Sequence, residues 1–235
     1  MEEGRTELSP GPVALIAARN EAGPLAATVS ALREAFPDVR VWVADDASED
    51  DTVKVAESSG AEVVTRKRPL GKGGNVTACA RTAIERGAFG DSDGIVLLLD
   101  ADLGETALQL SRLRDAIAEG ECDLAVGAFS RKVGGGFGVA LGFARWAIRN
   151  RCGFEAEAPI SGQRAMRRET LDRLLPFASG WGMEVGMTID AVRGGFTVRE
   201  YELDLAHRAT GRTISGFTHR FAQLAGFIRT WWARR

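Results

Sequence analysis

The feature that most constrains the fold is a run of five branched apolar residues, Ile95 to Leu99, that ends in two acids one residue apart, Asp100 and Asp102. An uninterrupted apolar run of this length predicts a strand buried on both faces, as in a parallel sheet. In open α/β sheets, ligands bind beyond the carboxyl ends of the strands. Two carboxylates there repel each other unless a divalent cation lies between them, usually with a phosphorylated ligand. The stretch therefore predicts a site for a metal and a nucleotide.

Strands and helices are expected to alternate regularly up to about residue 127. Further short apolar runs predict strands over 13–18, 39–44, 61–65 and 123–127. This alternation predicts a doubly wound, mostly parallel α/β sheet. Beyond it the pattern is less regular, and the expected elements are helices over 137–151, 168–175, 183–193 and 216–235 and strands around 161–166 and 196–203.

The sequence also predicts a helix cap, a glycine-rich loop and an amphipathic last helix. Ser48 is expected to cap the helix that follows the second strand, and residues 66–75 are expected to form a basic, glycine-rich loop before a helix over 76–86. The last helix is expected to be amphipathic. Its apolar face would carry Phe217, Phe221, Leu224, Ile228, Trp231 and Trp232, and the opposite face Arg220, Gln223 and Arg234.

Length and composition bound the class of protein. The chain has 235 residues, 45% of them hydrophobic and 26% charged, which is typical of a soluble globular protein. We expect a single domain over 13–235 after a disordered tail, 1–12. No apolar run approaches the roughly 20 residues of a membrane span, so any membrane contact is expected to be peripheral. The three cysteines lack the spacing of a disulfide framework or a zinc site, which fits a reducing cytoplasm.

The two halves of the chain differ in charge. Residues 1–128 contain 13 Lys and Arg and 23 Asp and Glu, a net charge of −10, whereas residues 129–235 contain 17 and 9, a net charge of +8. The second half is therefore predicted to attract anions. The alternative is that the high arginine content reflects codon bias alone. Nucleic-acid binding is not favoured, because the basic residues form no stripe interleaved with aromatic residues.

Four motifs stand at the ends of the expected strands and follow one another in a recognisable order. They are Ala17-Ala18-Arg19-Asn20-Glu21, Asp45-Asp46, Gly71-Lys72-Gly73 and Asp100-Ala101-Asp102. This order resembles the GT-A fold glycosyltransferases of family 2. Ser161-Gly162-Gln163-Arg164, Met183-Glu184 and the stretch from His207 to Arg212 look like elements of the polyprenyl-phosphate (dolichol-phosphate-type) sugar transferases in that family.

The resemblance implies that residues 13–128 bind a nucleotide sugar, a UDP- or GDP-hexose. The residues expected to contact it are Ala17, Arg19, Glu21, Asp45, Asp46, Lys72, Asp100 and Ala101. Lys72 could meet a phosphate together with backbone N–H groups of its glycine-rich loop. The alternatives are that Asp45 and Asp46 only begin the next helix and that Lys72 lies in a solvated turn.

The resemblance also implies a metal and a catalytic carboxylate. Asp100 and Asp102 are expected to hold Mg²⁺ or Mn²⁺, which neutralises the leaving diphosphate. Gly104 stands where some relatives have a further ligand, so His207 is the candidate third ligand and water the alternative. Glu184 would act as a base if the acceptor is a hydroxyl, and would orient groups if it is a phosphate. The alternative for Glu184 is a first-turn residue favoured by the helix dipole.

Residues 129–235 are expected to form the acceptor half. The candidate acceptor-binding residues are Arg131, Ser161, Gln163, Arg164, Trp181, Arg208 and Arg212. Arginines can grip a phosphate through bidentate contacts, and a tryptophan can stack on a sugar or acceptor. The helix over 216–235 would either lie on an anionic membrane surface or pack on its own domain or on the second copy of a homodimer.

The sequence thus predicts an inverting, metal-dependent hexosyltransferase acting in the cytoplasm, with an anionic acceptor. A polyprenyl phosphate is the first candidate acceptor, which would bring the protein to the inner face of the membrane. A phosphorylated small acid or a glycan hydroxyl is the second. From another class, a sugar-1-phosphate nucleotidyltransferase could share the fold, but its glycine-rich basic loop should stand where Arg19-Asn20-Glu21 follows the first strand.

Overall fold

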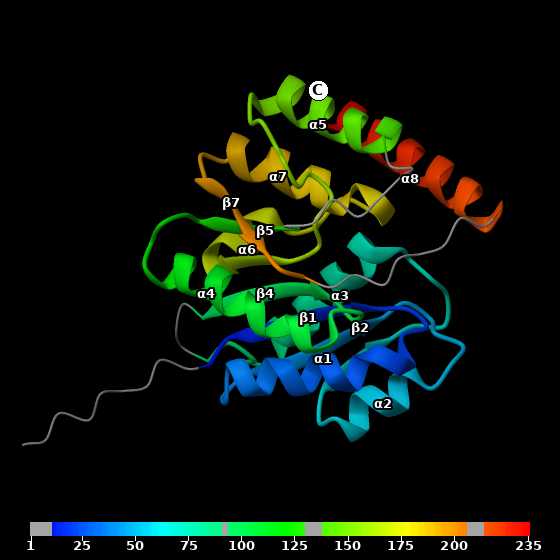
Figure 1. Cartoon of the computed structure of the whole chain (residues 1–235), viewed down its shortest axis with the longest axis vertical. Helices are drawn as coiled ribbons and strands as arrows, with labels where there is room; N and C mark the ends of the chain where they lie inside the picture. Colours follow the sequence, from blue (N-terminus) through cyan, green and yellow to red (C-terminus); the bar gives the residue numbers. More distant parts are fainter. Residues whose placement is uncertain (1–10, 91–93, 130–137, 206–213) are drawn as a thin grey trace, which may run out of the picture.

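The computed structural model describes residues 11–90, 94–129, 138–205 and 214–235. In this part of the chain seven strands form one sheet in the order β3-β2-β1-β4-β6-β5-β7 (Figure 1). The strands are β1 (Val13–Ala18), β2 (Arg40–Asp45), β3 (Glu62–Thr65), β4 (Ile95–Asp100), β5 (Leu124–Phe129), β6 (Arg164–Arg167) and β7 (Val198–Leu203). β6 runs antiparallel to its neighbours β4 and β5, and the other paired strands are parallel. The predicted α/β sheet is confirmed.

Helices cover both faces of the sheet. They are α1 (Ala22–Ala35), α2 (Thr52–Ser58), α3 (Lys72–Glu85), α4 (Leu110–Ala118), α5 (Gly138–Cys152), α6 (Arg168–Leu174), α7 (Met183–Arg193) and α8 (Ile214–Ala233), with 3₁₀ turns η1 (Gly104–Gln109) and η2 (Gly180–Gly182). Successive residues of β1 point to opposite faces. Ile16 packs with Leu25 of α1 and Leu113 of α4, whereas Leu15 packs with Val76 of α3 and Met187 of α7.

A further layer lies on the outer side of α7. Figure 1 shows α5 and α8 side by side above that helix, at the end of the molecule away from α1 and α2. A separate apolar cluster joins the three helices and contains Ala144, Val185, Ile189 and Phe227. α8 is therefore part of the folded body and buries apolar side chains against it.

Two helix starts differ from the sequence prediction. α2 begins at Thr52, with Asp51 at its N-cap position, so the prediction that Ser48 caps this helix was wrong. The Ser48 hydroxyl instead accepts a hydrogen bond from the Asn20 N–H, which lies after β1. α3 begins at Lys72 rather than at Val76, so the last four residues of the expected glycine-rich loop form the first helical turn. Glycines discourage a helix in isolation, and tertiary packing overrides this preference here.

The buried face of α8 also differs from the prediction. Phe227 and Thr230 are buried, while Ile228 and Trp232, which were predicted to lie on the apolar face, are 44% and 59% exposed. Arg234, expected on the opposite face, points inward and forms an ion pair with Asp190 of α7. The packed face is therefore rotated from the predicted one. The side chains of Phe217, Arg220 and Phe221 lie outside the described residues.

The described residues contain neither a disulfide nor a helix that could span a membrane. All three cysteines are free thiols, with Cys79 and Cys122 buried and Cys152 partly exposed. No helix within the described ranges is both long enough and apolar enough to cross a lipid bilayer.

Candidate active site

The site lies where the strand order reverses. β2 and β3 extend from one side of β1, and β4 pairs with the other side, with Ala17 opposite Asp100 in the register. Such a point leaves a crevice beyond the carboxyl ends of the strands. Ala101 is buried and its N–H donates to the Ala17 carbonyl, so the backbone rather than a side chain closes this junction.

The segment after β1 is hydrogen-bonded to the segment after β2. Asn20 has a positive φ of 57° and accepts from the Glu49 N–H through its side-chain oxygen at 2.8 Å. The Glu21 N–H donates to the Thr52 hydroxyl at 2.9 Å. Asn tolerates this left-handed backbone better than most residues. Arg19, by contrast, is exposed beside the crevice.

Asp45 is a buried carboxylate at the end of β2. It is 1% exposed, and its Oδ2 accepts from the Thr65 hydroxyl at 2.7 Å and from the Ser48 N–H at 3.3 Å. Its Oδ1 is buried and makes no hydrogen bond with any described residue. A buried acceptor left without a donor is costly, and a ligand N–H or O–H can relieve that cost.

Asp46 has a different set of partners. Its two carboxylate oxygens accept the backbone N–H groups of Leu70, at 2.7 Å, and of Gly71, at 3.0 Å. Gly71 is the N-cap residue of α3 and has a φ of +74°, which a residue with a side chain would adopt only with strain. Asp46 therefore fixes the turn that presents Lys72.

Lys72 lies between two carboxylates from distant parts of the chain. Its Nζ is 2.5 Å from Asp100 Oδ1 and 2.7 Å from Glu184 Oε1. Burial by itself would lower the pKa of the Lys72 ammonium, but the charges of Asp100 and Glu184 outweigh it and raise this pKa above its ordinary value. The ammonium thus links the end of β4 to the first turn of α7.

Two glycines allow the backbone to approach this ion-pair bridge. A Cβ on Gly162 would lie 2.5 Å from both Asp100 Oδ2 and Lys72 Nζ. A Cβ on Gly73 would collide with the Ala178 carbonyl oxygen. Gly73 thus allows close packing of α3 against the turn before α7, and Gly162 keeps a side chain away from Asp100 and Lys72.

Asp100 is also held from the β6 side. Gln163 Nε2 donates to Asp100 Oδ2 at 3.1 Å, and the Ser161 hydroxyl donates to Gln163 Oε1 at 2.9 Å. Two residues further on, Asp102 is partly buried at the edge of the crevice. The Ser161 and Gln163 side chains therefore orient a predicted metal ligand.

The donors at the end of β4 suit a hard divalent cation. Asp100 and Asp102 supply carboxylate oxygens, and Mg²⁺ is usually bound by one or two carboxylates together with substrate phosphates. Within the described ranges no group of three or more His, Cys, Asp or Glu side chains could hold a metal by itself. The residues present therefore fit a cation that shares its coordination sphere with a diphosphate.

Glu184, a member of the bridge, and Arg164 are both buried. Glu184 is 5% exposed in the first turn of α7, and Arg164 is 1% exposed on β6. Arg164 donates to the Ser161 carbonyl at 3.0 Å and to the Thr188 hydroxyl at 3.1 Å, and its Nη2 makes no hydrogen bond with a described residue. Burial lowers the pKa of this guanidinium to about 10, which the carboxylates of Glu184 and Glu200 oppose.

The other predicted acceptor residues divide into two groups. Trp181 is 36% exposed in η2, next to the start of α7. Arg131, His207, Arg208 and Arg212 lie outside the described residues, so the proposed third metal ligand and three of the arginines stay predictions.

Comparison with known proteins adds the family. The glycosyl transferase family 2 profile matches residues 13–175. The chain belongs to glycosyl transferase family 2. This enzyme is 32% identical to the undecaprenyl-phosphate mannosyltransferase of Micrococcus luteus, over 85% of each chain. It is 28% identical to the polyprenol monophosphomannose synthase of Mycolicibacterium smegmatis, over 84% of this chain and 78% of that one.

A solved structure is similar as well. Glucosyl-3-phosphoglycerate synthase from Mycobacterium tuberculosis, in complex with Mn²⁺, UDP and glucosyl-3-phosphoglycerate, superposes with a TM-score of 0.72 and 25% identity, over 95% of this chain and 80% of that one. The glycosyltransferase therefore has the GT-A fold that its motifs predicted.

Sequence reasoning about this glycosyltransferase missed several supporting residues. Thr188 stands four residues after Glu184 and so lies on the same side of α7, a spacing that could have paired the two. Thr65, at the end of β3, carries no such signal, because its partner Asp45 is far away in the sequence.

Proposed function

We propose that this glycosyltransferase transfers a hexose from a nucleoside diphosphate sugar to an acceptor phosphate, and that a polyprenyl phosphate is its acceptor. The observation that carries the proposal is the Lys72 bridge between Asp100 and Glu184 at the end of β4. It gathers a cationic group for the diphosphate, a carboxylate for the cation and a buried carboxylate for the sugar or acceptor within one crevice.

The nucleotide is proposed to bind over the ends of β1 and β2. Asp45 Oδ1, buried and without a hydrogen-bond partner in the described part of the chain, would accept from the base. Ala17, Arg19 and Glu21 would contact the base and ribose from the segment after β1. Asp46 already accepts two backbone N–H groups, so we assign it to holding the Lys72 turn rather than to reading the base.

Asp100 and Asp102 are proposed to hold Mg²⁺ or Mn²⁺ with the diphosphate. The cation would supply charge neutralisation for the departing nucleoside diphosphate. Lys72 would donate to the same phosphates, and Ala101 would place the two acids through its backbone. The side chains of Lys72 at the start of α3, of Asp100 at the end of β4 and of Asp102 just beyond it would thus surround the leaving group. His207 stays the candidate for a third protein ligand.

The reaction would invert the configuration at the anomeric carbon of the sugar. An acceptor oxygen forms a bond to the anomeric carbon as the bond from that carbon to the diphosphate oxygen breaks, and the electron pair leaves with the nucleoside diphosphate. An ionised acceptor phosphate brings no proton that must be removed, so Glu184 would then orient the sugar hydroxyls. With a hydroxyl acceptor, Glu184 would accept the proton. In either task, the Lys72 ammonium would hold the Glu184 carboxylate in place through their 2.7 Å contact.

The acceptor is proposed to approach from the half formed by residues 129–235. The excess of arginine over acid in that half favours a phosphate. Trp181, Arg131, Arg208 and Arg212 are the candidates for direct contact. Arg164 is too deeply buried for a surface contact, so we propose that it positions Ser161 and the Glu184 turn from behind. We also propose that 13–235 is one domain, since a single sheet spans both halves.

Two relatives act on polyprenyl phosphates according to their names, which supports the lipid acceptor. A soluble phosphorylated acid is the second candidate, because the similar solved structure holds glucosyl-3-phosphoglycerate. Both candidate acceptors carry a phosphate group. The family assignment removes the nucleotidyltransferase alternative.

The test is a panel of radiolabelled UDP- and GDP-hexoses with Mn²⁺ or Mg²⁺, each offered a short-chain polyprenyl phosphate in detergent or 3-phosphoglycerate in buffer. We expect label to enter the lipid phosphate with one of the nucleotide sugars. Transfer to 3-phosphoglycerate alone would move the assignment to the soluble acceptor. No metal-dependent consumption of any nucleotide sugar with either acceptor would refute the proposal.

A further inference from the structure

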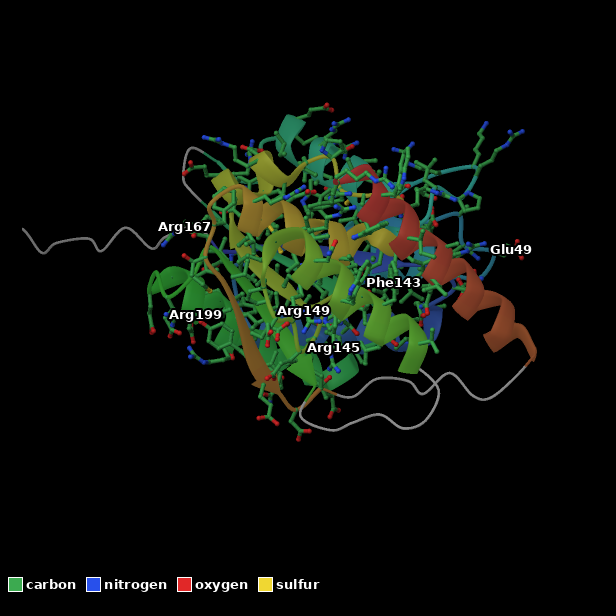
Figure 2. The ribbon with its side chains drawn as sticks, turned by 90° about the horizontal axis from the view of Figure 1, so that it is seen from above. Glu49, Phe143, Arg145, Arg149, Arg167 and Arg199 are labelled. Atoms are coloured by element: carbon green, nitrogen blue, oxygen red, sulfur yellow. The ribbon has the colours of Figure 1, made fainter. Side chains whose placement is uncertain are left out.

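The outer layer made by α5 and α8 has unusual surface chemistry. Seen from above, these two helices lie in front of the sheet and cross the face side by side (Figure 2). Neither helix contains an aspartate or a glutamate, and the sequence has no acid at all over 124–154 or over 205–235. Those two segments contain five and six lysines and arginines, respectively.

Aromatic rings join the two helices. The ring centroids of Phe143 and Trp146, both on α5, are 5.4 Å apart, and those of Trp146 and Trp231 are 5.3 Å apart. Trp146 remains 41% exposed, and on α8 Ile228 and Trp232 are also exposed. The outer face therefore carries large apolar side chains that no described segment covers.

Arginines are interleaved with these rings. Arg149 stands three residues after Trp146 and Arg229 three residues before Trp232, so each lies on the same side of its helix as an exposed ring. Both arginine side chains are exposed. The Arg235 guanidinium lies 4.8 Å from the Trp232 ring centroid. Indole rings with flanking arginines suit the interface of a bilayer, where apolar bodies reach the acyl boundary and cations meet lipid phosphates.

The same layer reaches the active site. A Cβ on Gly226 of α8 would lie 3.3 Å from the Trp181 Cβ, and a Cβ on Gly182 would collide with the Thr230 hydroxyl. The η2 turn in turn packs on the Lys72 turn, since a Cβ on Gly71 would lie 2.9 Å from the Gly180 Cα. One turn thus separates the outer layer from the bridge of Asp100, Lys72 and Glu184.

We propose that the α5–α8 face docks on an anionic lipid bilayer and holds the crevice beside the headgroups. The proposal rests on the proposed lipid acceptor and names the surface that brings the enzyme to it. A second copy of the chain fits less well. A twofold interface would set this acid-free, arginine-bearing surface against itself, and like charges would face each other without a counter-charge.

The test is vesicle flotation of the full-length protein in the absence of nucleotide sugar. One set of vesicles is neutral phosphatidylcholine, and in the other set phosphatidylglycerol makes up about a third of the lipid. We expect binding to the anionic vesicles only, weakened by added salt. Arg149→Glu with Arg229→Glu should reduce the affinity at least about tenfold, because each basic residue near an anionic surface contributes substantially. Trp232→Ala should also weaken it. Arg173→Glu on α6 is the matched control and should bind as the wild type does.

Turnover on a detergent-solubilised short-chain polyprenyl phosphate separates this inference from the proposed function. The double arginine variant should keep that turnover, which would show that the site is intact. Equal flotation of the double variant and the wild type, or no flotation of the wild type with turnover retained, would overturn the docking surface and leave the function standing. A dimer in light scattering that Trp232→Ala converts to monomer would assign the face to a second copy and overturn the inference as well.

Discussion

Replacing Lys72 with methionine tests the centre of the site most sharply. Methionine keeps the apolar stem but removes the ammonium that contacts Asp100 and Glu184 at 2.5 and 2.7 Å. Removing one partner of a fully buried ion pair costs about 3–5 kcal/mol. Asp100 is partly exposed and keeps its Gln163 contact, so we expect a smaller loss in the free energy of unfolding, about 2–4 kcal/mol.

The loss in the free energy of unfolding caused by Lys72→Met depends on pH in a direction that the structure predicts. The pKa of Lys72 is raised in the folded protein from an ordinary value of 10.5, so its stabilising contribution is complete below about pH 10 and is lost as the pH rises through the folded value. In urea unfolding, the difference in the free energy of unfolding between wild type and Lys72→Met should therefore be constant between about pH 6 and 9 and should shrink at higher pH.

A double-mutant cycle isolates the Lys72 and Glu184 contact. Glu184→Gln keeps a hydrogen-bond acceptor but removes the charge. If the bridge exists, the two substitutions should couple by about 1–3 kcal/mol in unfolding free energy. Additive effects, within about 0.5 kcal/mol, would refute the reasoning that the two side chains form one buried unit. Turnover of Lys72→Met should fall about 100- to 1,000-fold, the usual cost of losing one donor to a developing charge.

Three further substitutions, one of them with a glycine control, test the supporting residues. Asp46→Ala should lower the free energy of unfolding by about 1–3 kcal/mol in urea titrations and raise the KM for nucleotide sugar, because two backbone N–H groups lose their acceptor. Gly73→Ala should lower the free energy of unfolding by about 1–3 kcal/mol, because the added Cβ collides with Ala178. In the same urea titrations Gly23→Ala, whose Cβ meets nothing within 4 Å, should be neutral or stabilising. Arg164→Lys should lower kcat about 10- to 100-fold in steady-state assays with little change in nucleotide-sugar KM, and an unchanged kcat would contradict its positioning role.

The sheet was predictable because its signals are local. The apolar runs of β1, β2 and β4 stand out against polar surroundings, and the acids that follow them mark the carboxyl ends. The starts of α2 and α3 were not predictable in this way. Thr52 and Lys72 begin these helices because the segments pack against Glu21 and against the turn at Ala178, and such distant contacts leave no trace in a local pattern.

The candidate site shows the same division. Motif order placed Asp45 and Asp100 at one edge of the sheet, because parallel strands end there, and the structure pairs Asp100 with Lys72. Motif order did not distinguish Asp45, whose Oδ1 makes no hydrogen bond with a described residue, from Asp46, whose two oxygens accept the backbone N–H groups of Leu70 and Gly71. Two adjacent carboxylates look equivalent in a sequence, and only their hydrogen-bond partners separate them.

α8 shows how periodicity alone can misplace a face. A stripe that includes Ile228 and Trp232 is apolar at helical spacing, yet the helix buries Phe227 and Thr230 and turns Arg234 inward to Asp190. An ion pair across the α7–α8 contact thus accompanies a rotation of the helix from its apolar stripe. That rotation leaves the tryptophan exposed and creates the proposed docking surface.

The central claim, that Asp100 and Asp102 bind a nucleotide through a shared divalent cation, is tested most directly by calorimetric titration of UDP and GDP with and without Mn²⁺. In wild type, Mn²⁺ should tighten the binding of one nucleotide at least about tenfold, a typical coupling between two ligands. Asp102→Asn should abolish that enhancement and turnover while its circular dichroism spectrum and unfolding midpoint stay close to those of the wild type. Retained Mn²⁺ enhancement in a folded Asp102→Asn protein would contradict the account.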